Sequence, residues 1–114
     1  MDEVLRQTLL YDFYGELLTE HQREVYEAVV QNDLSYSEAA EEFGVSRQGV
    51  HDLVKRSGKI LEEYESKLHL VDRFLEIRAK AERILELSSH YKEIDARSFA
   101  EQVSSLSSQI LEEL

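Results

Sequence analysis

Hydrogen-bond donors crowd into one short segment near the middle of this sequence. Arg47 and Gln48 carry planar donor groups of the kind that pair with guanine or adenine edges. Lys55, Arg56 and Lys59 follow close behind and suit phosphate oxygens. These residue types indicate contact with a nucleic acid, although the same side chains could equally be the solvated surface of a helix.

Charge is spread unevenly along the 114 residues, whose formal net charge is −11. Residues 1–43 hold 11 acidic and two basic side chains, and residues 61–114 hold 12 acidic and seven basic ones. Residues 44–60 carry four bases and one acid, Asp52, and form the one basic window. This reversal of sign favours nucleic-acid contact, while the acidic remainder predicts weak, salt-sensitive binding unless the target is specific or the protein dimerises.

The segment that must position these donors has the pattern of a helix-turn-helix. Ala40, Gly44 and Val50 fall where this motif needs a small residue, a positive φ and a β-branched residue in the wedge. Ser46 can cap the second helix. With Val50 pointing inward and 100° between successive residues, the donors project outward. The candidate nucleic-acid-binding residues are Ser46, Arg47, Gln48, His51, Lys55, Arg56 and Lys59.

The absence of proline and the presence of only four glycines favour long helices, and hence an all-α fold. Leu5, Leu9 and Phe13 fall at helical spacing and predict a helix over residues 3–14, which Gly15 can end in a left-handed conformation. Two capping boxes, at residues 19–22 and 35–38, predict the N-termini of two further helices. Ala39 and Ala40 are expected at the close contact between the two helices of the motif, and Val45, Val50 and either Leu53 or Val54 are expected to fill the wedge between them. The stripe expected along the long second helix is Val50, Val54, Ser57, Leu61, Tyr64 and Leu68.

Two further apolar stripes occupy the C-terminal third. One spans residues 70–84 and the other 99–114, with a break expected near residue 69 and a joint at 88–95. The two helices could cover each other as a hairpin within one chain. Because a core of about 65 residues is marginal alone, we predict instead a homodimer formed through this region. The expected domains are residues 1–68 and 69–114.

Two family resemblances follow from these residues. The segment "EAAEEFGVSRQGVHDLVKRSGKIL" resembles region four of bacterial sigma factors, whose helix-turn-helix reads promoter DNA. Residues 9–70, which include the block "DFYGELLT", are similar to the YlxM family of small bacterial proteins. The resemblance implies a sigma region four-like helix-turn-helix domain, here with a C-terminal helical extension. Gly49 stands where that family usually has alanine, which predicts a less rigid recognition helix.

The YlxM resemblance also implies a biological setting. The family is linked by gene neighbourhood to the signal recognition particle GTPase and its receptor, which implies a regulatory role in that pathway. We therefore expect a nucleic-acid-binding regulator, with DNA preferred to RNA as its ligand. The alternative is an adaptor whose acidic N-terminal half meets a basic surface of the particle, or whose long helix contacts its RNA, without sequence-specific DNA binding.

Enzymatic chemistry is not expected. The four histidines, His21, His51, His69 and His90, lie far apart in sequence and lack metal-ligand spacing, so we expect no metal and no cofactor. The tripeptide "SGK" lacks the strand and first glycine of a phosphate-binding loop. Without cysteine, and without a long apolar run at the N-terminus, the chain is compatible with the reducing cytoplasm, and we expect no membrane insertion.

Overall fold

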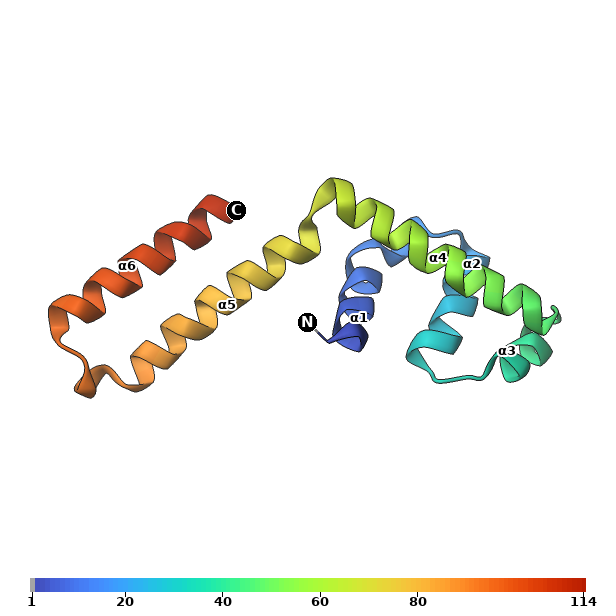
Figure 1. Ribbon diagram of the computed structural model, residues 1–114, viewed down its shortest axis with the longest axis horizontal. Coiled ribbons are helices and arrows are strands. Elements are labelled where there is room, and N and C mark those ends of the chain that lie inside the picture. The colour runs from blue at the N-terminus through green and yellow to red at the C-terminus, as the bar shows by residue number, and fades with distance from the viewer. Residues whose placement is uncertain (1) are drawn as a thin grey trace. The chain divides into compact units, whose positions relative to one another are not determined.

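The computed structural model describes residues 2–114, and this part of the chain is all-α, as predicted. It divides into two compact units, one ending at His69 and the other formed by Leu70–Leu114, which are described separately (Figure 1). The helices are α1 (Glu3–Tyr14), α2 (Glu20–Tyr26), α3 (Tyr36–Phe43), α4 (Arg47–Leu68), α5 (Leu70–Ser89) and α6 (Ala96–Glu113). Short helical turns lie at η1 (Gly15–Leu17), η2 (Glu27–Gln31) and η3 (Tyr91–Glu93).

Local capping sets the starts of α2 and α3. The hydroxyl of Thr19 accepts from the backbone N–H of Gln22 at 3.2 Å, and the Gln22 side chain accepts from the Thr19 N–H at 3.0 Å. Ser35 and Glu38 make the same reciprocal pair, both at 3.0 Å. Both predicted capping boxes are confirmed. The hydrogen bonds from the backbone and side chain of Ser35 hold the pKa of Glu38 below its usual value.

The core of the first unit lies between α2, α3 and α4, and in Figure 1 the long α4 lies across α1, α2 and α3. Val25, Ala39 and Val50 are fully buried at its centre. Half-buried side chains complete this core, namely Val29, Leu34, Tyr36, Ala40, Phe43, Leu53 and Val54. Ala39 is therefore the small residue at the centre of the contact between the helices, with Ala40 at its edge.

The turn between α3 and α4 depends on Gly44, which ends α3 at φ 66° and ψ 35°, as predicted. The N–H groups of Gly44 and Val45 both donate to the carbonyl of Ala40. This backbone path carries the Val45 side chain out of the wedge, and it is 38% exposed. The prediction that Val45 fills the wedge is wrong, because the left-handed glycine reverses the chain one residue before it.

Helix α1, whose bounds agree with the prediction, packs on α4 through one face. Leu9, Leu10 and Tyr14 are buried, while Leu5 and Phe13 are exposed. The Tyr14 hydroxyl donates to Glu65 of α4 at 2.6 Å, and this buried contact fixes the rotation of α1. Glu65 is itself buried where an apolar stripe was expected to continue to Leu68, which is exposed.

Gly15 is needed for a different reason from the predicted one. Gly15 is right-handed at φ −57°, so the prediction of a left-handed end is wrong. A Cβ on Gly15 would lie 2.9 Å from the Tyr11 ring, so glycine is needed there for close approach. The Tyr11 ring in turn stacks on Tyr26 at 5.7 Å, and its hydroxyl donates to Glu27 of η2, a π-helical turn that the sequence did not predict.

The second unit is a hairpin of two antiparallel helices. α4 ends at His69 in a left-handed conformation, at the predicted break, and α5 and α6 then pack along each other on either side of η3 (Figure 1). The predicted stripes are shielded only in part: their half-buried residues are Ile77, Ile84, Phe99, Val103, Leu106 and Ile110. The buried residues of α5, Val71 and Leu87, lie outside the predicted stripe. Of the residues of α6, all of which the structure describes, none is buried. No helix in residues 2–114 is both long and apolar enough to cross a membrane.

Candidate nucleic-acid interface

The candidate interface is the N-terminal half of α4, which the preceding turn and cap hold in place. The Ser46 hydroxyl accepts from the Gly49 N–H at 2.9 Å and so starts the helix. Val50 is fully buried and anchors one face of α4 in the core. The face of α4 that carries the hydrogen-bond donors therefore points outward. Of the predicted contact residues, only His51 is half-buried, and the exposed ones are Ser46, Arg47, Gln48, Lys55, Arg56 and Lys59.

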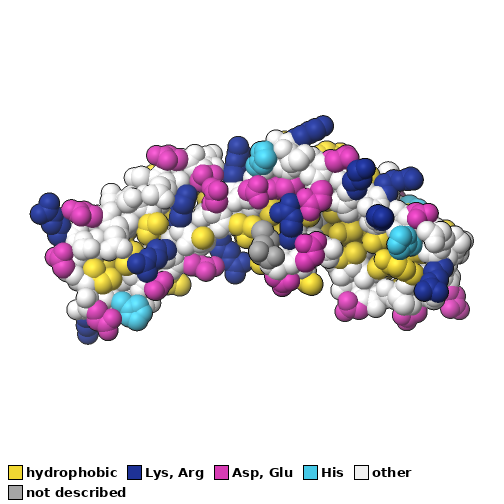
Figure 2. Space-filling model, viewed as in Figure 1, with side chains coloured by type: hydrophobic (Ala, Val, Ile, Leu, Met, Phe, Trp, Pro, Cys, Tyr) yellow, Lys and Arg dark blue, Asp and Glu magenta, His cyan; other side chains and the backbone are white. Residues whose placement is uncertain are grey.

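The charges separate on this unit as the sequence predicted. Figure 2 shows Lys and Arg side chains gathered over α4, while Asp and Glu side chains dominate the edge formed by α3 and the segment before it. A positive stripe beside negative flanks would orient the unit toward a polyanion with α4 leading. It would also confine attraction to that stripe, because the flanks repel phosphate.

Gly49 has a local reason in this chain. A Cβ at this position would lie 3.0 Å from the Ser46 hydroxyl oxygen, which is the atom that caps α4. Glycine therefore leaves room for the cap at the expense of helix propensity, since glycine is about 1 kcal/mol less favourable than alanine inside a helix. The first turn of α4 thus keeps its capping hydrogen bond without crowding.

Asp52 is bonded within the interface and does not simply face solvent. Its Oδ1 accepts from the Gln48 carboxamide Nε2 at 2.9 Å and lies 3.4 Å from the His51 Nδ1. The Gln48 hydrogen bond, followed by that of His51, holds the pKa of Asp52 below its usual value. The sequence analysis did not identify this pair, although the i, i+4 spacing between Gln48 and Asp52 was a signal for it.

An aromatic residue of α3 borders the donors. The Tyr36 ring meets His51 edge to face, with centroids 5.3 Å apart and planes at 82°. Tyr36, Arg47, Gln48 and His51 together line an open pocket of about 470 Å³. Sequence reasoning missed Tyr36, although its place directly after the Ser35 cap fixes it at the start of α3, beside the turn.

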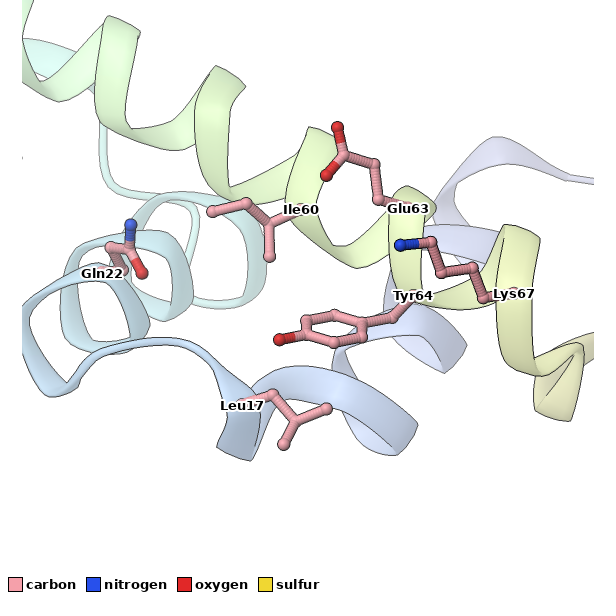
Figure 3. Close-up of a pocket in the computed structure, with 6 residues that line it drawn as sticks. All are labelled: Leu17, Gln22, Ile60, Glu63, Tyr64 and Lys67. Carbon is pink, nitrogen blue, oxygen red and sulfur yellow. The ribbon is translucent and has the colours of Figure 1, made fainter.

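A second open pocket lies further along α4. It has a volume of about 410 Å³ between the C-terminal half of α4 and the η1–α2 junction, and Figure 3 shows the Tyr64 ring extending into it. Leu17 and Ile60 give it apolar walls, whereas Gln22, Glu63 and Lys67 are polar. The Tyr64 ring also stacks on Tyr14 at 6.0 Å. The pocket begins beyond the last donor, Lys59, and its charged residues, one acid and one base, add no net positive charge to the stripe.

A short turn, a buried wedge and an outward, capped second helix define a helix-turn-helix protein, the class that the sequence predicted. The comparison with known families agrees. The chain belongs to the UPF0122 family, described as "Putative helix-turn-helix protein, YlxM / p13 like", which matches residues 1–101. The resemblance to the YlxM family is thereby confirmed, and it extends well beyond residues 9–70.

Relatives share the family over most of their length. The chain is 51% identical over 85 residues to the UPF0122 protein of Caldanaerobacter subterraneus subsp. tengcongensis, covering 75% of this chain and 73% of that protein. It is 42% identical over 107 residues to the UPF0122 protein of Halalkalibacterium halodurans, covering 93% and 92%. The second match includes most of the sequence that forms the α5–α6 hairpin in this chain.

Proposed function

We propose that this protein binds double-stranded DNA through the N-terminal half of α4 and acts as a regulatory protein. The observation that carries the proposal is the set of exposed donors on a capped helix, in the one segment of net positive charge. Arg47 and Gln48 stand at the helix start, where helices of this class meet base edges. Lys55, Arg56 and Lys59 follow as phosphate contacts.

Groove geometry favours DNA over RNA as the ligand. The major groove of B-DNA is about 12 Å wide and admits an α-helix, so the outward half of α4 fits it. The major groove of an A-form RNA duplex is deep and narrow, and side chains cannot read it. We therefore expect a DNA duplex to bind more tightly than an RNA duplex of the same length and sequence.

Chemical-shift mapping tests this proposal. Adding a random-sequence DNA duplex to ¹⁵N-labelled protein should move amide signals from residues 46–59 and from Tyr36 in low salt. Signals from residues 3–12 of α1, which contacts the C-terminal half of α4 through Glu62 and Glu65, serve as the internal control and should stay in place. Movement confined to α1, or equal binding of an RNA duplex, would contradict the proposal.

We place this activity in the signal recognition particle pathway, in the cytoplasm. This part of the proposal rests on the gene-neighbourhood link that the resemblance to the YlxM family implies. The second candidate function is an adaptor, and it is favoured by the net charge of −9 on residues 1–43, which suits a basic protein surface. Co-purification from the native cell, with both nucleic acid and protein partners identified, separates the two. Particle components recovered after nuclease treatment would support the adaptor, whereas DNA alone would support the regulator.

We also propose that the chain is a homodimer, with residues 1–68 and 69–114 acting as separate domains. The support is the hairpin itself, because its two helices leave their apolar stripes half exposed and leave Leu85 and Leu111 67% and 69% exposed. A second hairpin covering the same face would make a four-helix bundle, a common way to bury such stripes. A two-fold dimer would also present two α4 helices to DNA half-sites.

Sedimentation equilibrium tests the dimer. The wild type should give about twice the chain mass of 13.3 kDa at tens of micromolar. Leu85→Glu with Leu111→Glu should shift it to monomer without unfolding, since both side chains point outward. Glu86→Gln with Glu112→Gln, changes to exposed polar side chains on the same helices, is the control. A wild type that stays monomeric would leave the hairpin as a structure closed within one chain.

A further inference from the structure

We infer that Asp52 is a positioning residue for sequence readout: its carboxylate fixes the orientation of the Gln48 carboxamide, so that Gln48 selects adenine over guanine. The inference rests on the proposed DNA-binding function. It adds which nucleobase Gln48 recognises and how the protein selects that nucleobase. It gives a function to Asp52, the one acidic side chain among the four basic side chains of residues 44–60.

The contact geometry carries the first step. Gln48 and Asp52 are one turn apart on α4, and the hydrogen bond runs from the Gln48 Nε2 to the Asp52 Oδ1 at 2.9 Å. Only the nitrogen end of the carboxamide can donate to a carboxylate. The contact therefore defines which end of the Gln48 side chain is nitrogen and turns that end toward Asp52. Because His51 Nδ1 lies 3.4 Å from the same oxygen, the carboxylate is itself held from a second side.

The second step concerns the hydrogen-bonding groups of the Gln48 carboxamide that remain free for a base. With one N–H bonded to Asp52, Gln48 retains a carbonyl oxygen that accepts and one N–H that donates. Adenine presents the matching pair in the major groove, an amino group at N6 and an acceptor at N7. Guanine presents two acceptors, N7 and O6, so the fixed carbonyl oxygen of Gln48 would face an acceptor. A free carboxamide could turn around and offer both N–H groups to guanine instead.

The third step concerns charge. Asp52 is exposed beside Lys55 and Arg56, so its charge opposes phosphate contact for every DNA sequence alike. The orientation that Asp52 gives the Gln48 carboxamide, by contrast, favours binding only where the base edge matches it. The same carboxylate therefore lowers non-specific affinity and sharpens base choice, which together raise the ratio of specific to non-specific binding.

Two substitutions separate orientation from charge. Asp52→Asn keeps an oxygen that can accept from Gln48 but removes the charge, whereas Asp52→Ala removes both. Glu63→Gln is the control, because Glu63 is an exposed acid on the same helix beyond the donors. Each variant, with the wild type and Gln48→Ala, is used to select binding sites from a random DNA duplex pool. Affinities are then measured on the selected site and on copies in which guanine replaces the adenine.

The wild type should select an adenine that Gln48→Ala no longer selects, with at least a tenfold preference over guanine. Asp52→Asn should keep most of this preference while binding random DNA more tightly. Asp52→Ala should reduce the preference to within about threefold, and Glu63→Gln should leave it unchanged. A preference that survives Asp52→Ala, or one that Gln48→Ala does not affect, would overturn the inference.

A second readout does not need DNA. In ¹⁵N spectra of the free protein, the two side-chain N–H signals of Gln48 should be widely separated, because one bonds a carboxylate. They should converge in Asp52→Ala and stay as they are in Glu63→Gln. If the signals converge as expected but the wild type selects no DNA sequence, the DNA-binding function fails and this inference falls with it. If the wild type selects a sequence but the signals do not respond to Asp52→Ala, the inference alone fails.

Discussion

The two units of this chain use their long helices, α4 in the first and α5 and α6 in the second, in opposite ways. The first unit has a closed core, with Val25, Ala39 and Val50 fully buried and α1 tied to α4 by the Tyr14–Glu65 hydrogen bond. In the hairpin, α6 has no buried residue, and three leucines, Leu85, Leu111 and Leu114, are more than 60% exposed. The first unit holds its donors on a rigid support, whereas the hairpin presents apolar surface that its own two helices do not cover.

This difference suits the two tasks that we propose for the units, DNA binding by the first and self-association by the second. A helix that reads DNA must be held at a fixed angle, which requires a buried anchor on its other side. A helix that assembles with another chain must keep part of its apolar face free until the partner arrives. The substitutions below test whether stability and assembly divide between the units in this way, and they are ordered from the largest expected effect to the smallest.

The largest effect should come from the fully buried Leu61 of α4. Leu61→Ala should lower the free energy of unfolding by about 2–5 kcal/mol, because it removes buried apolar contacts and leaves a cavity. The matched change Leu111→Ala, on a largely exposed leucine of α6, should cost under about 0.5 kcal/mol in monomeric protein. Urea unfolding followed by far-ultraviolet circular dichroism measures the helices of both units, and tyrosine near-ultraviolet circular dichroism follows mainly the first unit, which holds five of the six tyrosines. Equal costs would remove the contrast between the units.

A smaller effect should separate the two alanines of the turn. Ala39→Leu should cost about 1–3 kcal/mol, because the site is fully buried between α3 and α4 and the larger side chain overpacks it. Ala40→Leu should cost less, since Ala40 is only half-buried. The same urea titration measures both variants. If Ala40→Leu were the more damaging change, the helices would cross one residue later than described.

Much of this arrangement could be predicted, because the signals that produced it are local. The capping boxes at Thr19 and Ser35, the left-handed Gly44 and the outward face of α4 each depend on residues within one or two turns. Their physics is complete within a short window of sequence.

What could not be predicted depends on contacts across the chain. The hydrogen bond between Tyr14 and Glu65 joins residues 51 positions apart, and it decides which face of α1 is buried. The need for glycine at residue 15 arises from the Tyr11 ring, which in turn is placed by Tyr26 and Glu27. Periodicity treats a polar residue as outward facing, so it could not indicate that Glu65 would be buried.

Alkaline pH should weaken the first unit through Tyr11. Burial, and then the hydrogen bond to Glu27, raise the pKa of Tyr11 from 10.0 to about 12. A folded-state pKa above the unfolded value means that the stabilisation is complete below pH 10 and is lost as the pH rises toward 12. Tyr11→Phe should reduce this loss. Melting temperatures at pH 9 and pH 11.5 measure it, and parallel declines in the wild type and Tyr11→Phe would exclude this tyrosine as a cause.

The smallest change, and one of opposite sign, is expected at Ser57. Its hydroxyl oxygen is buried in α4 without a hydrogen-bond partner in the described part of the chain. Ser57→Ala removes that unsatisfied group and improves helix propensity, so it should stabilise the first unit by about 0.5–1 kcal/mol. Ser104→Ala, on the exposed surface of α6, compares propensity alone. A loss of stability in Ser57→Ala would show that the hydroxyl has a role in the core.

The central claim is that α4 binds nucleic acid through its basic side chains. Fluorescence anisotropy of a labelled DNA duplex at several salt concentrations tests this claim most directly. Wild-type affinity should fall steeply with salt, and Lys55→Ala with Arg56→Ala should weaken binding and reduce the slope by about 1.8, or about 0.9 per lost phosphate contact. Arg78→Ala with Arg83→Ala makes the same change of charge on α5 and should leave the slope unaltered. Equal slopes for the wild type and the α4 variant would contradict the account.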